Sequence, residues 1–411
     1  MARSRIDVRL LFATRITRLF AYGALSVVLA LYLAAIGLDE GRIGLLFSLT
    51  LAGDAAVTLT ITTTADRLGR RRSLMLGAAL MALAGAAFLL TRQPTLLLLA
   101  AIIGVISPSG NEIGPFLAIE QAGLAQILPD AQRTQVFAWY NLVGSLATAA
   151  GALAGGLLVQ ALQSGGRSSV NAYQAVLLGY ALCGLLLIAW FFYLSPAVEP
   201  SPSAGIASVR RRFGLHRSGP IVLRLSGLFA LDAFAGGFVI QSIVAYWFYT
   251  RFGLSPAALG AIFFAANLLA GASALLAARL AARFGLINTM VMTHLPSNVL
   301  LCLVPLMPTL PLAIAVLLLR FSISQMDVPA RQSYTMAVVS PDERSAASGV
   351  TAIARSVGAS ISPWLSGLLL ARGYFAAPFL LAGGLKIAYD LLLYRSFRAF
   401  EPPEEAALDA S

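Results

Sequence analysis

Charged residues are scarce in this 411-residue sequence. Only 11% of its residues are Asp, Glu, Lys or Arg, whereas 58% are hydrophobic. A soluble domain has about 25% charged and about 45–50% apolar residues, so the composition excludes a soluble globular protein. The formal net charge of +11 does not indicate a nucleic-acid-binding protein, because the basic residues are spread between apolar runs instead of covering one face. The positive charge is therefore better explained by basic residues in the loops of a membrane protein.

Cysteine and histidine are also rare, with two of each in the sequence. Both cysteines, Cys183 and Cys302, lie inside apolar runs, which argues against a disulfide framework and against a thiolate metal cluster. The sequence has no G-x-x-x-x-G-K phosphate-binding loop, nucleophile triad, metal motif or cofactor fingerprint. We therefore expect that the protein is not an enzyme, is not driven by ATP, and binds no cofactor or resident metal.

The hydrophobic runs are long enough for about twelve membrane-spanning helices. A bilayer core about 30 Å thick needs about 20 apolar residues at a rise of about 1.5 Å each. The first run contains Arg15 and Arg18 and has no small-residue cleavage site, so we interpret it as a retained helix and not as a signal peptide. The predicted helices cover residues 10–37, 42–64, 73–91, 95–127, 135–162, 172–194, 220–250, 256–278, 286–309, 311–338, 346–371 and 374–396.

The distribution of basic residues predicts that both termini are cytoplasmic, since cytoplasmic loops are enriched in Lys and Arg. With the N-terminus inside, 17 of the 29 basic residues fall in cytoplasmic segments, 5 in outside loops and 7 within predicted helices. We expect a multi-pass protein of the cytoplasmic (inner) membrane that contacts the lipid bilayer and no nucleic acid, and that functions as a monomer.

The chain divides into two similar halves. Residues 195–219, rich in Pro, Ser and Arg, predict a cytoplasmic linker between six-helix halves at 1–194 and 220–396, and residues 397–411 predict a cytoplasmic tail. At an offset of 216 residues the segment 65–69 aligns with 281–285, and Gly37 aligns with Gly253. Two parallel repeats are typical of transporters in which one half rocks against the other. The expected fold class is an all-α membrane protein with twelve transmembrane helices in two pseudo-symmetric halves.

The loop after the second predicted span resembles a known family signature. Residues 65–72 read Ala-Asp-Arg-Leu-Gly-Arg-Arg-Arg, which is similar to the D-R-x-G-R-R/K motif of the major facilitator superfamily. Together with the spans and the repeat, the resemblance covers residues 10–396 and implies a secondary transporter with its path between the halves. A cytoplasmic latch is expected from the motif, and topology anchoring by its arginines is the alternative. The latch residues are Asp66, Arg67, Gly69, Arg70 and Arg71.

The sequence departs from the family patterns at several positions. Thr62 stands where the signature usually begins with Gly, and the run 151–156 resembles an exporter pattern in which Ala152 replaces a proline. The arginine usual in the fourth span of drug antiporters is absent between Leu96 and Ile113. Because the exporter patterns match only in part, efflux of a drug-like solute is one possible function among several. The glycines of 151–156 fit close helix packing equally well.

Burying a polar side chain at membrane depth costs free energy, so the polar residues that occur there indicate where the functional site lies. The fourth predicted span contains two prolines and two glycines within residues 108–115, which predicts a broken helix beside a wet cavity. Glu112 is the first candidate for proton coupling or substrate binding, and a permanent structural ion pair with an arginine is its alternative. Asn111 is its neighbour, and Glu120 lies eight residues later on the same broad helical face.

The second half has a matching carboxylate, because Glu112 aligns with Asp327 at an offset of 215. Arg320 and Arg331 lie on the same predicted helix, which favours a structural or gating ion pair at Asp327 over a free proton site. Asp54 has no basic residue within one turn, so Arg18 or Arg355 is its expected partner. The remaining candidates for proton or substrate binding are Asp232, His294 and Asn298, with packing as the alternative for His294.

We therefore predict a secondary transporter that moves a small solute by alternating access, coupled to protons and able to act as an efflux antiporter. An exporter of divalent metal or organic cations is one alternative, with Glu112, Asp327, His294 and Met326 as donors. Anionic substrates are another, because Arg320, Arg331 and Arg355 lie at membrane depth. A lipid flippase and a non-transporting membrane sensor are the alternatives of a different class.

Overall fold

The computed structural model describes residues 2–112, 114–200, 217–340 and 343–397, so most of the predicted linker and tail lies outside the described residues. The described residues form helices and short connections, with no strand among them. They fall into two compact units. The first unit comprises Met1–Val209 and Ile240–Phe264, and the second comprises Arg210–Val239 and Ala265–Ser411.

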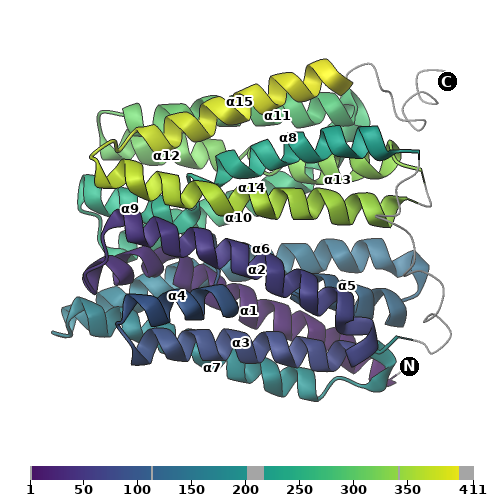
Figure 1. The fold of residues 1–411 in the computed structure, drawn as a ribbon, viewed down its shortest axis with the longest axis horizontal. Helices are drawn as coiled ribbons and strands as arrows, with labels where there is room; N and C mark the ends of the chain where they lie inside the picture. The colour runs from purple at the N-terminus through teal and green to yellow at the C-terminus, as the bar shows by residue number, and fades with distance from the viewer. Residues whose placement is uncertain (1, 113, 201–216, 341–342, 398–411) are drawn as a thin grey trace. The chain divides into compact units, whose positions relative to one another are not determined.

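The helices of the first unit follow the predicted spans closely, and Figure 1 shows their order. They are α1 (Ala2–Ala35), α2 (Glu40–Leu68), α3 (Arg70–Leu90), α4 (Pro94–Ile103), α5 (Phe116–Ile127), α6 (Asp130–Ser164), α7 (Ser169–Phe192), the short 3-10 helix η1 (Pro196–Val198) and α9 (Gln241–Phe252).

The second unit contains the other helices, and α10 (Pro256–Phe284) runs across the boundary between the units. The other helices of the second unit are α8 (Gly219–Gly237), α11 (Leu286–Leu303), η3 (Val304–Leu306), α12 (Leu310–Phe321), α13 (Asp327–Ala337), α14 (Arg344–Ala371) and α15 (Ala377–Phe397). Among the described residues, nine helices are long and apolar enough to cross a membrane, and α4 and α12 are shorter apolar helices. The count of twelve spans stays a prediction.

Three predicted spans are interrupted. The predicted break in the fourth span is confirmed, because α4 ends at Ile103, α5 begins at Phe116, and the segment between them contains Gly110 and Gly114 at φ +70° and +79°. Two further breaks were not predicted. The span expected at 220–250 is present as Gly219–Phe252, but residues 238–240 divide it into α8 and α9. The span expected at 311–338 consists of α12 and α13, which are separated by residues 322–326.

The same turn joins α2 to α3 and α10 to α11. Gly69 has φ +97° and Gly285 has φ +79°, a backbone region that suits glycine. Each glycine donates its N–H to the carbonyl four residues earlier, on Ala65 and Ala281, at 2.9 and 3.0 Å. The two loops that align in the sequence therefore have matching backbone geometry.

Small residues bring helix backbones together in both units. A Cβ on Gly151 of α6 would lie 2.0 Å from the carbonyl oxygen of Phe20 on α1, and one on Gly358 of α14 would lie 2.3 Å from that of Ala230 on α8. The helix pairs α1–α6 and α8–α14 thus both pack through a glycine that lets the backbones approach. The pairs α3–α7 and α11–α15 also correspond to each other in the two units. Gly151 and Gly155 serve the packing of α6 against α1, and Gly156 serves its packing against α10.

Helix α9 is attached to α1 inside the first unit. The Gln241 amide donates to the Ser26 hydroxyl at 2.7 Å, and the Ser242 hydroxyl donates to the Ser26 carbonyl at 2.7 Å. The Ser242 N–H also donates to the carbonyl of Pro108 in the broken span, at 3.0 Å. The bond between Ser242 and Pro108 uses backbone groups that the breaks at 104–115 and 238–240 release.

Candidate functional site

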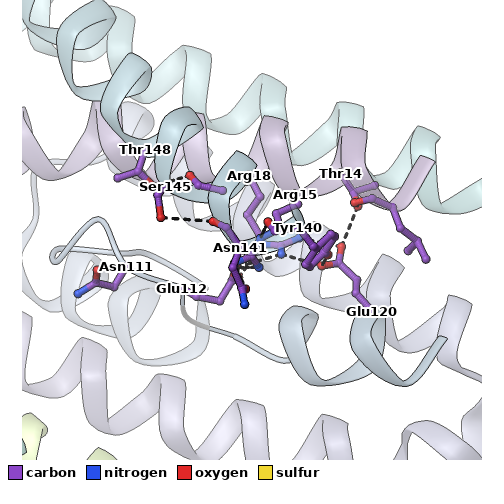
Figure 2. A network of polar contacts seen from close by, with 12 residues as sticks. Thr14, Arg15, Arg18, Asn111, Glu112, Glu120, Tyr140, Asn141, Ser145 and Thr148 are labelled. Atoms are coloured by element: carbon purple, nitrogen blue, oxygen red, sulfur yellow. Dashed lines mark hydrogen bonds and ion pairs between the residues drawn. The ribbon is translucent and has the colours of Figure 1, made fainter. Parts of the chain in front are cut away.

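A buried polar network lies where α1, α6 and the broken fourth span meet. We call it the N-terminal cluster, and Figure 2 shows its members at close range. On α1, Thr14, Arg15 and Arg18 are close enough in sequence to share one side of the helix, with Arg18 one turn after the other two. The members of the cluster are Thr14, Arg15, Arg18, Glu112, Glu120, Tyr140 and Asn141.

Glu120 is the fully buried carboxylate of this cluster. Its side chain has 0% exposure and accepts from Arg18 Nη1 at 2.9 Å and Arg18 Nη2 at 2.7 Å. It also accepts from the Thr14 hydroxyl at 2.8 Å and from the Tyr140 hydroxyl. Four donors satisfy both oxygens, as a charge buried in a membrane protein requires.

Glu112 is the partly accessible carboxylate, with 14% of its side chain exposed. It accepts from Arg15 Nη1 at 2.8 Å and from Arg18 Nε and Nη2 at 2.8 and 3.2 Å. Arg15 is itself held by the Tyr140 carbonyl at 2.8 Å and by the Asn141 side chain at 3.3 Å. Two carboxylates and two guanidiniums therefore form one charge-balanced network.

Asn111, the neighbour of Glu112, takes no part in this network. Its side chain is exposed, and Figure 2 places it on the broken segment away from the dashed contacts of the arginines. Its backbone carbonyl accepts from the Ser107 hydroxyl at 2.8 Å. Asn111 thus helps to shape the break through its backbone.

Of the two partners expected for Asp54, Arg18 is wrong. Arg18 is bound to Glu112 and Glu120 and forms no ion pair with Asp54 among the described residues, whereas the pairing of Asp54 with Arg355 stays a prediction. Oδ1 of Asp54 is buried and accepts no hydrogen bond from the described residues. The expectation failed because the two glutamates occupy the guanidinium that it relied on.

A second buried network lies in the second unit, between α8, α11, α13, α14 and α15. Asp232 is at its centre. It contacts Lys386 Nζ at 2.5 Å, Arg355 Nη1 at 3.1 Å and Arg331 Nη1 at 3.2 Å. We call this network the C-terminal cluster, and its members are Asp232, His294, Asn298, Arg320, Asp327, Arg331, Arg355, Lys386 and Asp390.

Asp327 and His294 occupy different parts of the C-terminal cluster. Asp327 accepts from Arg331 Nη1 at 3.1 Å, one helical turn away, which is the pairing that the sequence predicts. His294 Nδ1 lies 2.7 Å from Asp390, and the Asn298 amide donates to the same carboxylate at 2.9 Å. The role of His294 as proton carrier or packing residue stays a prediction.

Comparison with known proteins gives the family of the chain. The sequence pattern of the Major Facilitator Superfamily matches residues 11–325 and 228–410, which together cover most of the chain. The chain belongs to the major facilitator superfamily. It is 32% identical to the uncharacterized membrane protein YJR124C of Saccharomyces cerevisiae, over 94% of this chain and 93% of that protein.

Solved transporters of this superfamily share the fold. The nucleoside transporter NupG aligns with a TM-score of 0.73 at 14% identity, covering 95% of this chain and 99% of NupG. A D-xylose-proton symporter aligns with a TM-score of 0.73 at 15% identity, covering 96% of this chain and 98% of the symporter. This superfamily member is thus a multi-pass membrane protein and a transporter of a small solute, not an enzyme.

The superfamily signature lies at the start of α3. Arg70 Nε donates to Asp66 at 3.0 Å, and Nη1 of Arg70 donates to the Gln126 side chain at 2.8 Å. The carboxylate of Glu199, just after η1, accepts from the backbone N–H groups of Arg70 and Arg71 at 2.7 and 3.1 Å. Arg67 is exposed. These contacts tie the start of the linker to α3, while the gating role of the motif stays a prediction.

Several residues of both clusters are absent from the candidates that the sequence predicts. Thr14 and Asn141 gave no signal, because a hydroxyl or an amide in a helix is common. Lys386 and Asp390 did give one, since a charged residue inside an apolar run is costly. They lie four residues apart in the last predicted span; Lys386 is one of the seven basic residues within predicted helices, and Asp390 is not among the predicted candidates.

Proposed function

We propose that this transporter is a proton-coupled secondary transporter of the cytoplasmic membrane, with both termini inside, and that Glu112 is its proton-exchange site. The carrying observation is the contrast between the two glutamates of the N-terminal cluster. Glu112 is 14% exposed and bridges Arg15 and Arg18, whereas Glu120 is 0% exposed and bound by four donors.

Protonation of Glu112 would change the charge balance of the network. With both glutamates ionised, two negative charges face two guanidiniums. With a proton on Glu112, Arg15 and Arg18 would share the single charge of Glu120, to which only Arg18 is hydrogen-bonded. An uncompensated buried charge is strongly unfavourable. The proton would therefore weaken the bonds that hold the broken span against α1.

This coupling has a mechanical consequence. Glu112 lies in the non-helical segment 104–115, and its three bonds to Arg15 and Arg18 join that segment to α1. The segment has glycines in the left-handed region and contributes a carbonyl to α9. Release of Glu112 would allow it to move without unfolding a helix. Alternating access in this fold class is largely rocking of one repeat against the other around a fixed site, and we infer that release of Glu112 permits this movement.

The experiment uses proteoliposomes with the full chain and an imposed pH gradient. A panel of sugars, nucleosides, amines and carboxylic acids is first screened for uptake in both orientations, which also gives the direction of transport. With a transported solute, Glu112→Gln is expected to abolish gradient-driven accumulation and to retain solute exchange at equal pH. Glu40→Gln is the matched control, because Glu40 is hydrogen-bonded to Tyr246 outside the cluster. Accumulation by Glu112→Gln against the solute gradient would overturn the proposal.

A further inference from the structure

The C-terminal cluster contains more positive than negative side chains. Four cations lie in it, Arg320, Arg331, Arg355 and Lys386, and three carboxylates, Asp232, Asp327 and Asp390. His294 adds a further positive charge whenever it is protonated. Charges at membrane depth are normally paired with one another, so at least one positive charge of this cluster lacks a counterion among the described residues.

The excess is not shared equally between the cations. Asp232 has one oxygen on Lys386 and the other on both Arg331 and Arg355, and Arg331 has Asp327 as a second partner. Arg355 has only the Asp232 oxygen, which it shares with Arg331. In the described part of the chain, Arg320 forms no ion pair, and its buried Nε has no hydrogen-bond partner. Arg320 and Arg355 thus carry the positive charge that is least compensated.

Arg355 also has a free hydrogen-bonding edge. Only its Nη1 is bonded, at 3.1 Å to Asp232, so Nε and Nη2 are left without a protein acceptor among the described residues. These two nitrogens form the fork that binds a carboxylate or a phosphate with two parallel hydrogen bonds. Arg355 is also more accessible than its neighbours, with 34% of its side chain exposed, against 10% for Arg331 and Lys386.

We infer that the C-terminal cluster binds the acidic group of a free small organic anion, a carboxylate or a phosphate, on the Nε and Nη2 edge of Arg355. Arg320 adds attraction for the same group, because its charge has no ion-pair partner among the described residues. Asp232 holds Arg355 in place and is shared with Lys386 and Arg331. The inference names the substrate class of the transporter and so rests on the proposed function, but it concerns residues that the proton-exchange proposal does not use.

The test measures binding to the purified full chain in detergent at one pH and constant ionic strength, so no proton gradient is involved. Acetate, succinate and inorganic phosphate are the free acidic probes, glucose and choline are the neutral and cationic probes, and dihexanoyl phosphatidic acid represents a lipid headgroup. Binding is followed by calorimetric titration and by the rise of the melting temperature, which a ligand of the folded state produces.

We expect saturable binding of at least one free acid. Arg355→Gln should weaken it at least tenfold, and Arg355→Lys should weaken it less, because it keeps the charge and loses the fork. Arg372→Gln, a change of the same kind at an exposed arginine just after α14, should leave it unchanged. The melting temperature without probe reports whether each variant is folded. Lys386 and Arg331 still neutralise Asp232 in Arg355→Gln, so we expect it to fold.

Three results would overturn the inference: no saturable binding of any free acid, binding of the lipid analogue alone, or equal binding by Arg355→Gln and Arg372→Gln. Glu112→Gln separates the two proposals. If that variant binds the acid normally and still accumulates solute, the proton-exchange proposal fails and the anion site stands. If it loses accumulation while no acid binds to any form of the protein, the anion site fails and the proton-exchange proposal stands.

Discussion

Arg18 offers the sharpest test of the N-terminal cluster, because it is the cation bonded to both glutamates. It is 0% exposed and donates four hydrogen bonds, two to Glu112 and two to Glu120, at 2.7 to 3.2 Å. Arg18→Met keeps much of the apolar volume and removes the charge. Removal of one partner of a buried ion pair costs about 3–5 kcal/mol, so we expect a loss of stability of that size.

The assay is equilibrium unfolding of the purified protein in mixed micelles of increasing SDS content. Arg42→Met is the control, because Arg42 and Asp39 are 65% and 55% exposed and such a pair contributes about 0–1 kcal/mol. The double variant Arg18→Met with Glu120→Gln removes one charge of each sign, and the glutamine oxygen can still accept from Thr14. It should be more stable than Arg18→Met by about 1–3 kcal/mol. Equal losses in Arg18→Met and Arg42→Met, or no recovery in the double variant, would refute the reasoning.

Two further variants test the packing and the start of α3. Gly151→Ala places a Cβ 2.0 Å from the Phe20 carbonyl oxygen and should cost about 1–3 kcal/mol, whereas Gly179→Ala meets nothing within 4 Å and should stabilise by up to about 1 kcal/mol; similar unfolding curves for the two would contradict the close contact. Glu199→Gln removes the carboxylate that accepts from the first N–H groups of α3 and should cost about 0.5–2 kcal/mol. Hydrogen exchange should be faster in the first turn of α3 in that variant, and unchanged protection there would contradict the capping role.

The local features of the fold were predictable because local sequence causes them. Two prolines and two glycines at 108–115 remove helical hydrogen bonds and permit positive φ, and the broken fourth span follows from them. The break between α8 and α9 was missed because it has no proline. Gly236 and Gly237 precede it, and glycine alone is common inside membrane helices.

The sequence predicts which charged residues at membrane depth matter, but not which of them pair with one another. Glu112, Glu120 and Arg18 were all expected to matter, because each is costly at membrane depth. Their pairing joins residues that are 94 and 102 positions apart. It depends on how closely α1 packs with its neighbours, which a periodic pattern in one helix does not contain. The same limit explains why Asp54 was given the wrong partner.

The two units repeat their packing but not their charges, and this difference locates the proposed chemistry. Backbone contacts through glycine recur in α1–α6 and α8–α14, so the repeat accounts for the shared fold. The N-terminal cluster balances two carboxylates with two guanidiniums, whereas the C-terminal cluster has four cations for three carboxylates. A balanced network with one accessible carboxylate is suited to exchange a proton, since its charge changes by one when Glu112 is protonated. An excess of guanidinium with a free edge is suited to hold an anion. If both proposals are correct, removal of charge at Glu112 and at Arg355 should give separable losses, one of coupling and one of binding.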